Sequence, residues 1–301
     1  MNENNLLHDM KMMFKYWIKI LCIYLLGQSN KKIDFMIIGA QKCGTTALSA
    51  YMNKHPFCTG SNNKEPLLFT KYYKEKLGLK RIVEYYCFNK FLKNRGNCLF
   101  FEATPDYIYE EEVPARIYRY NPQIKMIFLV REPVSRAISE YNMGCRYAIE
   151  KNLCVREDPD REYFDCLKQP DRYPFRWFVE EEFRKMKETG SRLPSAFHYP
   201  DMIRHGFYNE QLERYYQYFN PDQFLILDSK DLKEKKRETL SAIEDFLEIP
   251  HYDWPENELE NSNIGVYTQQ VPAEYKQFLK EYFKPWNEKF FELIGKRMDW
   301  Q

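Results

Sequence analysis

A glycine loop follows the first apolar run of the chain and could bind an anion. The stretch GAQKCGTT has two glycines in phosphate-loop spacing and comprises Gly39, Ala40, Gln41, Lys42, Cys43, Gly44, Thr45 and Thr46. In such a loop, successive backbone N–H groups and the start of the following helix converge on a phosphate or a similar group. The same residues could also form only a strand-to-helix turn. We interpret them as a candidate phosphate-binding loop with Lys42 as its cation.

The position of the lysine indicates which anion fits this loop. In a loop that hydrolyses nucleoside triphosphates, Lys and Ser/Thr follow the last glycine, and the hydroxyl binds magnesium. Here Thr45 follows Gly44, and the apolar run KMIFLV ends at Arg131, where such a site needs an acidic metal ligand. This pattern disfavours a kinase or NTPase. It favours a site without a metal, in which cations and amides hold the nucleotide.

A second motif, LVREPVSRAISEYN, contains Arg131, Pro133 and Ser139. Proline is well suited to the first position of a helix, so a strand ending at Arg131 is predicted to lead directly into a helix. Arg131 and Ser139 could then bind a second phosphate at some distance from the first. Taken alone, the motif is equally compatible with an arginine that caps the sheet and a serine that faces solvent.

Together, the two motifs resemble those of the sulfotransferases that use 3′-phosphoadenosine 5′-phosphosulfate (PAPS). The resemblance is closest to the branch that contains the heparan sulfate N- and 3-O-sulfotransferases and many bacterial relatives. It extends through KEPLLF (64–69), EATPDY (102–107), YNEQLERYYQYF (208–219) and FKPWNEKFFELIG (283–295).

The resemblance implies a role for each motif. PAPS would be the donor co-substrate, and no metal would be needed. Lys42 would bind the bridging and leaving oxygens, and Glu65 of KEP would accept the proton of the acceptor. The residues expected to bind the donor are Gly39, Ala40, Gln41, Lys42, Cys43, Gly44, Thr45 and Thr46 of the loop, Arg131 and Ser139 at the 3′-phosphate, and Tyr208. A protein that binds the nucleotide without catalysis is the alternative, and retention of both Lys42 and Glu65 disfavours it.

The sequence departs from the family pattern where the acceptor should bind. Leu67 stands where the heparan 3-O enzymes carry a histidine, and Ala103 stands where they carry a lysine. Two polar contacts to an acidic sugar chain are therefore missing. We expect a small hydroxylated or amine-bearing acceptor, with a heparan-like polysaccharide as the alternative.

Alternating elements are expected to position these residues. Short apolar runs predict buried strands at Ile33–Ile38, Cys98–Phe101, Lys125–Val130 and Phe224–Leu227. Helices are predicted at Gly44–Asn53, Pro133–Tyr147, Tyr208–Phe219, Asp231–Leu247 and Pro272–Tyr282. This alternation indicates an α/β fold with a P-loop-type parallel sheet flanked by helices, in which ligands bind at the carboxyl ends of the strands. Residues 148–205 break the alternation and are predicted to be a helical insertion that covers the acceptor, although their aromatic residues could simply pack together.

Composition limits the remaining possibilities. Lysine and arginine (45) nearly balance aspartate and glutamate (44), so a nucleic-acid partner is not expected. The eight cysteines form no CxxC pair, so metal-ligand spacing is absent, and a disulfide at Cys43 would distort the glycine loop. Together with the lack of an Asn-x-Ser/Thr sequon, this favours a reducing compartment, and we expect a cytoplasmic enzyme. Residues 1–30 are predicted to be an amphipathic or apolar helix and residues 31–301 a single domain. The apolar part of that first segment is shorter than a membrane-spanning helix, so membrane association is possible but not expected.

Overall fold

A five-stranded parallel sheet organises the part of the chain that the structure describes. The computed structural model describes residues 32–61, 64–70, 98–150, 161–196, 199–259 and 267–300. The strand order is β2-β3-β1-β4-β5. The bounds are β1 Phe35–Gly39, β2 Cys58–Gly60, β3 Leu99–Ala103, β4 Lys125–Val130 and β5 Phe224–Asp228. Because both faces are covered by helices, β1 and β4 are almost uniformly apolar, as buried parallel strands require.

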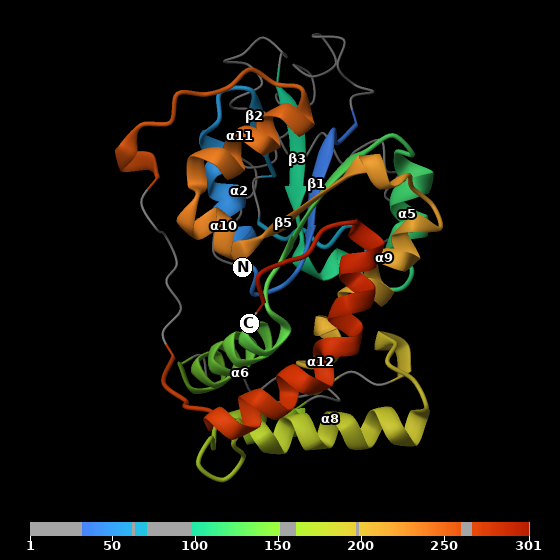
Figure 1. Cartoon of the computed structure of the whole chain (residues 1–301), viewed down its shortest axis with the longest axis vertical. Helices are drawn as coiled ribbons and strands as arrows, with labels where there is room; N and C mark the ends of the chain where they lie inside the picture. Colours follow the sequence, from blue (N-terminus) through green and yellow to red (C-terminus); the bar gives the residue numbers. More distant parts are fainter. Residues whose placement is uncertain are drawn as a thin grey trace, which may run out of the picture.

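Helices cover the two faces of the sheet and form a further layer beyond its carboxyl edge. Figure 1 shows α2, α10 and α11 on one face, α5 and α9 on the other, and α6, α8 and the first half of α12 below the strands. The bounds are α2 Thr45–Lys54, α5 Val113–Tyr120, α6 Pro133–Glu150, α7 Arg161–Leu167, α8 Phe175–Thr189, α9 Tyr208–Tyr216, α10 Ser229–Glu234, α11 Lys236–Leu247 and α12 Ala273–Ile294. The predicted α/β class is confirmed.

Several predicted elements differ in extent from the observed ones. β2 was not expected, because its three residues, CTG, carry no apolar run. The single helix expected over residues 231–247 is two helices, α10 and α11, separated at Lys235. The helix expected over residues 272–282 continues to Ile294 with Pro285 inside it. Residues 1–30, predicted to form an N-terminal helix, lie outside the described residues.

Two hydrophobic clusters explain the length of α12. One cluster surrounds the sheet and includes Phe290 from the second half of α12. The other lies among α6, α7 and α8 and includes Leu279 and Phe283 from its first half. Since α12 contributes to both, burial of its apolar side chains offsets the cost of one internal proline. The helices of residues 161–189 thus pack with α6 and the first half of α12 into a second core beside the sheet.

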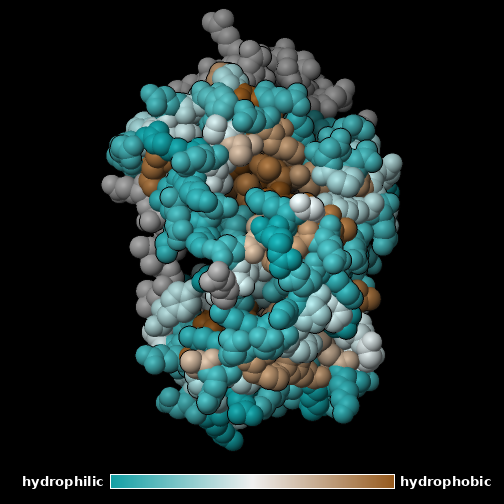
Figure 2. All heavy atoms as spheres, viewed as in Figure 1, coloured by the Kyte–Doolittle hydropathy of each residue, from teal (hydrophilic) through white to brown (hydrophobic). Residues whose placement is uncertain are grey.

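The outer faces of these helices are mostly polar. The view in Figure 2 is largely hydrophilic, with apolar side chains gathered mainly in one area of its upper half. On α8, the exposed ion pairs Arg176–Glu180 and Arg184–Glu188 each join two residues that are one helical turn apart. Within the described ranges, no helix combines the length and the apolar character needed to cross a bilayer.

The short helix η3 (Pro105–Ile108) packs closely against the end of β1, at Gly39. A Cβ atom at Gly39 would lie 3.0 Å from Ile108 Cβ and 3.1 Å from the Pro105 carbonyl oxygen. Tyr107, in the middle of η3, donates a hydrogen bond to the buried Glu102 of β3. The first glycine of the loop is therefore needed for packing, because a side chain there would push η3 away from β1.

Candidate active site

A cavity of about 1030 Å³ lies at the carboxyl ends of the strands. It is lined by both predicted motifs and by Glu65, so the structure brings together residues that are far apart in the sequence. The predicted residues in its wall are Gln41, Lys42, Cys43, Gly44, Thr45, Thr46, Glu65, Arg131 and Ser139. Gly39, Ala40 and Tyr208 were also predicted to bind the donor, and they lie outside this wall.

The glycine loop is held in a turned conformation that opens toward the cavity. Its start is tied to the neighbouring strand β4, because the N–H of Ala40 donates to the Leu129 carbonyl at 2.6 Å. Lys42 and Gly44 have φ of 69° and 92°, in the left-handed region that glycine adopts most readily. Gly44 directly precedes α2, whose first residues, Thr45 and Thr46, also line the cavity. This arrangement leaves the N–H groups at the start of α2 available to an anion.

Lys42 is the loop's partly buried cation. Burial lowers the pKa of its ammonium group, and the negative charge of Glu140 partly opposes this shift. Its Nζ lies 3.1 Å from the sulfur of Met143, a weak acceptor that does not neutralise the charge. Lys42 thus offers a cation to a ligand in a partly desolvated place, where electrostatic attraction is stronger than in water.

Tyr208 contacts both the glycine loop and the residue that follows β4. It is buried, its hydroxyl donates to the Arg131 carbonyl at 2.9 Å, and its oxygen lies 3.8 Å from the sulfur of Cys43. The ring therefore connects the loop to the end of β4. The hydroxyl of Tyr208 is directed at the protein backbone, and its assignment to the donor stays a prediction. Gly39 and Ala40 are likewise buried and contribute packing.

Arg131 and Ser139 face the cavity together with a residue that was not assigned from the sequence. Arg131 follows β4, and Ser139 lies on α6, whose first turn is capped by Glu132 through the N–H groups of Val134 and Ser135. The guanidinium of Arg131 donates to the hydroxyl of Tyr267 at 3.3 Å. Ser139 lines the same part of the cavity and helps to lower the pKa of Tyr267. These three side chains form a polar group that could bind a second anion.

Glu65 stands at the cavity in an uncommon backbone conformation. Its φ is 58°, and that of Leu67 is 57°, values that non-glycine residues seldom adopt. Lys64 joins the segment to the glycine loop region, since its ammonium donates to Glu65 Oε1 at 2.5 Å and to Thr46 Oγ1 at 2.6 Å. A carboxylate is thereby held near the start of α2, within the same cavity as Lys42.

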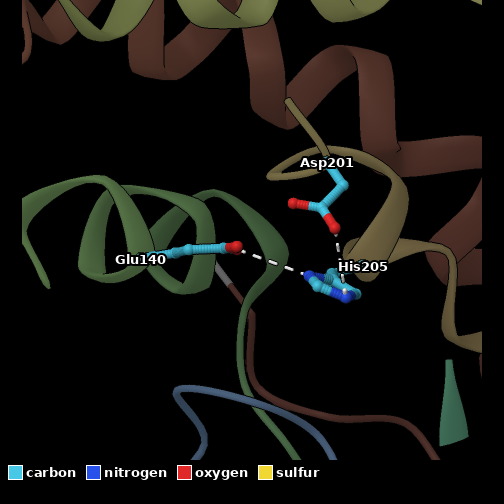
Figure 3. Close-up of side chains that lie close together, drawn as sticks. All are labelled: Glu140, Asp201 and His205. Atoms are coloured by element: carbon cyan, nitrogen blue, oxygen red, sulfur yellow. Dashed lines mark ion pairs between the residues drawn. The ribbon is translucent and has the colours of Figure 1, made fainter. Parts of the chain in front are cut away.

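A buried cluster of ionisable residues lies behind this wall. Figure 3 shows His205 between two carboxylates, with its Nδ1 3.5 Å from Glu140 and its Nε2 3.9 Å from Asp201. The guanidinium of Arg136 lies 2.7 Å from Glu140. The oxygens and nitrogens of the three residues in the figure are close enough to suggest a metal site. However, the two ring nitrogens point to different carboxylates and a guanidinium already pairs with Glu140, so an ion-pair network describes the cluster better than a cation site.

The sequence reasoning missed Trp300 as a residue of the cavity wall. Its indole N–H donates to Asp228 Oδ2 at 2.8 Å, which places it at the end of β5. Its ring is parallel to Phe290, with centroids 5.9 Å apart and planes 5° from parallel. No sequence pattern around Trp300 indicates a binding site. Trp300 reaches the cavity because of the path that the chain takes after α12. The aromatic ring gives the cavity a flat apolar surface at this end.

The chain belongs to the sulfotransferase family, because the family model described as the sulfotransferase domain matches residues 32–292. It is 27% identical over 338 residues to membrane-associated sulfotransferase kil1 of Dictyostelium discoideum, with 93% of this chain and 69% of the relative covered. It is 25% identical over 284 residues to heparan sulfate glucosamine 3-O-sulfotransferase 5 of Mus musculus, with 88% and 73% covered. The family resemblance expected from the two motifs is confirmed, and the protein class is a transferase.

A solved structure supports the fold. The sulfotransferase from Alicyclobacillus acidocaldarius superposes with a TM-score of 0.59 at 18% identity, covering 89% of this chain and 98% of that one. At this level of identity the similarity establishes the architecture alone. The roles of individual residues in the cavity therefore have to be argued from their own geometry.

The charge of Glu140 is predicted to help keep Lys42 protonated. In a Glu140→Gln variant the opposing negative charge is lost, so the pKa of Lys42 should fall further below its ordinary value. Competitive labelling with acetic anhydride, followed by mass spectrometry across alkaline pH, measures the pKa of this amine. Glu234→Gln is the matched control, because Glu234 also lines the cavity but is not among the charges that act on Lys42. Equal labelling profiles for Glu140→Gln and the unmodified protein would contradict the prediction.

Proposed function

We propose that the protein transfers a sulfuryl group from PAPS to a hydroxyl or amine of an acceptor, by in-line displacement that needs no metal. The observation that carries this proposal is the single cavity in which the Lys42 loop and the Arg131–Ser139 pair both take part. PAPS has two separate anionic groups, a 5′-phosphosulfate and a 3′-phosphate, and this wall offers two separate groups of cations and donors.

In this proposal the residues of the chain align the reactants and stabilise the departing charge. The acceptor oxygen or nitrogen bonds to sulfur as the bond from sulfur to the bridging phosphate oxygen breaks. The electron pair of that bond remains on the phosphate, where Lys42 and the N–H groups of the loop offset its charge. Glu65 accepts the acceptor's proton, and the products are the sulfated acceptor and adenosine 3′,5′-bisphosphate.

The adenine base would lie toward Trp300 in this arrangement. The wall at this end includes Leu232 of α10 and the indole ring of Trp300. One face of that ring is already stacked on Phe290, which holds it in a fixed orientation. A flat aromatic ring of this kind suits stacking by a purine base, which has an exposed π-face.

A P-loop kinase or NTPase is the principal competitor, and nucleotide binding separates the two. We expect adenosine 3′,5′-bisphosphate to bind with the same affinity in the presence and absence of EDTA, and more tightly than ATP with magnesium. The physical reason is that the cavity places Arg131 where a metal-binding acid would be needed and adds donors for a 3′-phosphate. Isothermal titration calorimetry measures both affinities. Tighter binding of magnesium-ATP would refute the assignment of the donor.

Substitutions in the wall test the two catalytic roles. Loss of the ammonium group in Lys42→Ala should lower kcat by about 10²–10³-fold, the usual effect of removing one group that stabilises developing charge. Glu65→Gln should lower kcat by about 10²–10⁴-fold, as expected when a general base is lost. Turnover of PAPS by each purified variant is the measurement. Lys233→Ala and Glu234→Gln line the same cavity and should stay near the unmodified rate; equal losses in these controls would count against specific roles for Lys42 and Glu65.

For the acceptor, we propose a small hydroxylated or amine-bearing molecule. Two of the lysines at the cavity, Lys64 and Lys230, already pair with Glu65 and Asp299, at 2.5 Å and 2.7 Å, so these two offer little net positive charge to a polyanion. Leu67 and Ala103 replace the polar residues that the resemblance associates with acidic sugars. A heparan-like polysaccharide is the second candidate, favoured by the names of relatives such as the mouse 3-O-sulfotransferase 5.

Labelled sulfuryl donor distinguishes the two acceptor classes. We expect the label to enter small molecules of a cell extract, detected by mass spectrometry, and not to enter partly desulfated heparan sulfate. The reason is that Leu67 and Ala103 stand where the resemblance places two polar contacts to an acidic sugar chain. Preferential labelling of the polysaccharide would reverse the assignment of the acceptor.

The cytoplasmic location expected from the sequence stays a prediction. Cys43, Cys145 and Cys166 are buried free thiols, as is usual for a reducing compartment. The name of the Dictyostelium relative instead refers to a membrane association of that protein.

A further inference from the structure

Asn142 of α6 forms hydrogen bonds with residues 268 and 269, which are distant from it in the sequence. It is buried, and its side-chain oxygen accepts hydrogen bonds from the backbone N–H groups of Thr268 and Gln269, both at 2.9 Å. Its side-chain N–H₂ group donates to the carbonyls of Ile138, at 3.0 Å, and Gln269, at 3.5 Å. One amide thus satisfies several backbone groups and holds residues 268 and 269 against the helix.

The residue just before this anchor is Tyr267, and its hydroxyl lies among cations and donors. Arg131 donates to it at 3.3 Å, and Ser139 lines the cavity beside it. The Tyr267 side chain also lines the cavity and is about half exposed. Partial burial alone would raise the pKa of Tyr267, but the Ser139 hydroxyl and the charges of Arg131 and Lys42 lower it. The phenol oxygen therefore occupies a place that favours negative charge.

The spacing on α6 explains why this anchor affects the site. Ser139 and Asn142 are three residues apart and so lie on one face of the helix. The same rigid element that presents the serine to the cavity also fixes the backbone that carries Tyr267. Without this anchor, the hydrogen bond from Arg131 to the Tyr267 hydroxyl would remain, and a single hydrogen bond contributes little to holding a segment in place.

We infer that Asn142 is a positioning residue that holds Tyr267 so that its hydroxyl, with Arg131 and Ser139, donates to the ribose 3′-phosphate of the nucleotide. This inference rests on the proposed function and extends it, because it gives the 3′-phosphate a third donor. Tyr267 then contributes to the discrimination between nucleotides with and without that phosphate. Asn142 does not touch the nucleotide and acts through the backbone at residues 268 and 269.

The test compares adenosine 3′,5′-bisphosphate with adenosine 5′-monophosphate, each titrated by calorimetry into the full chain. Tyr267→Phe should weaken binding of the bisphosphate by about tenfold, the usual effect of removing one hydrogen bond to a charged group, and leave the monophosphate unchanged. Asn142→Leu should give the same pattern. The double variant Tyr267→Phe/Asn142→Leu should lose no more than the larger single loss.

The results separate this inference from the proposed function. Equal weakening of both nucleotides, or no weakening of either, in Tyr267→Phe would overturn the donor role of Tyr267 even if the unmodified protein prefers the bisphosphate. Additive losses in the double variant would overturn the link between the two residues. If the unmodified protein prefers magnesium-ATP, the proposed donor itself is wrong. Tyr267 is half exposed, so its variant should fold even if the buried Asn142→Leu does not, and thermal denaturation checks both.

Discussion

The pairing of β1 with β4 in the middle of the sheet is the constraint on which the site depends. The two strands run parallel, so the glycine loop and Arg131 leave the sheet at the same edge. A hydrogen bond from Ala40 to Leu129 continues the pairing into the loop. The hydroxyl of Tyr208 contacts both the Arg131 carbonyl and the Cys43 sulfur, and so connects the two segments. As a result, two motifs that each have an ordinary structural explanation come to line one cavity, and it is their combination that indicates function.

Buried charged residues next to the cavity help to keep Lys42 protonated. Burial disfavours the charged form of Lys42, and the nearby Glu140 favours it. Glu140 is itself paired with Arg136. Burial alone would raise the pKa of Glu140, but the interactions with Arg136 and His205 outweigh burial and lower this pKa to about 2. The ion-pair network therefore keeps a fixed negative charge close to the loop without presenting a carboxylate to the ligand. A buried network of this kind adds little stability by itself, but it can maintain the charge of a neighbouring functional group.

Local patterns in the sequence were enough to predict the strands and the loop, and not enough to predict how distant segments meet. The run KMIFLV gave β4 with its observed bounds, and GAQKCGTT located the loop, because both signals lie within a few residues. The extension of α12 past Pro285 depends on packing with two separate cores. The contact between Asn142 and residues 268 and 269 depends on the fold of the intervening chain. The same limit applies to Tyr208: similarity predicts that it binds the donor, but only the fold shows that its hydroxyl donates to the Arg131 carbonyl.

The two halves of the wall differ in how they are built, and this bears on specificity. The 5′ half comes from one continuous loop and the first turn of α2, so its geometry is largely determined by local backbone conformation. The 3′ half is assembled from Arg131 after β4, Ser139 on α6 and Tyr267 after a distant segment. Small changes in packing would move these three relative to one another and leave the loop intact. For the donor proposed above, recognition of the 3′-phosphate should therefore depend more on tertiary structure than binding of the 5′ group, which makes it the part of the site where relatives with the same loop can diverge.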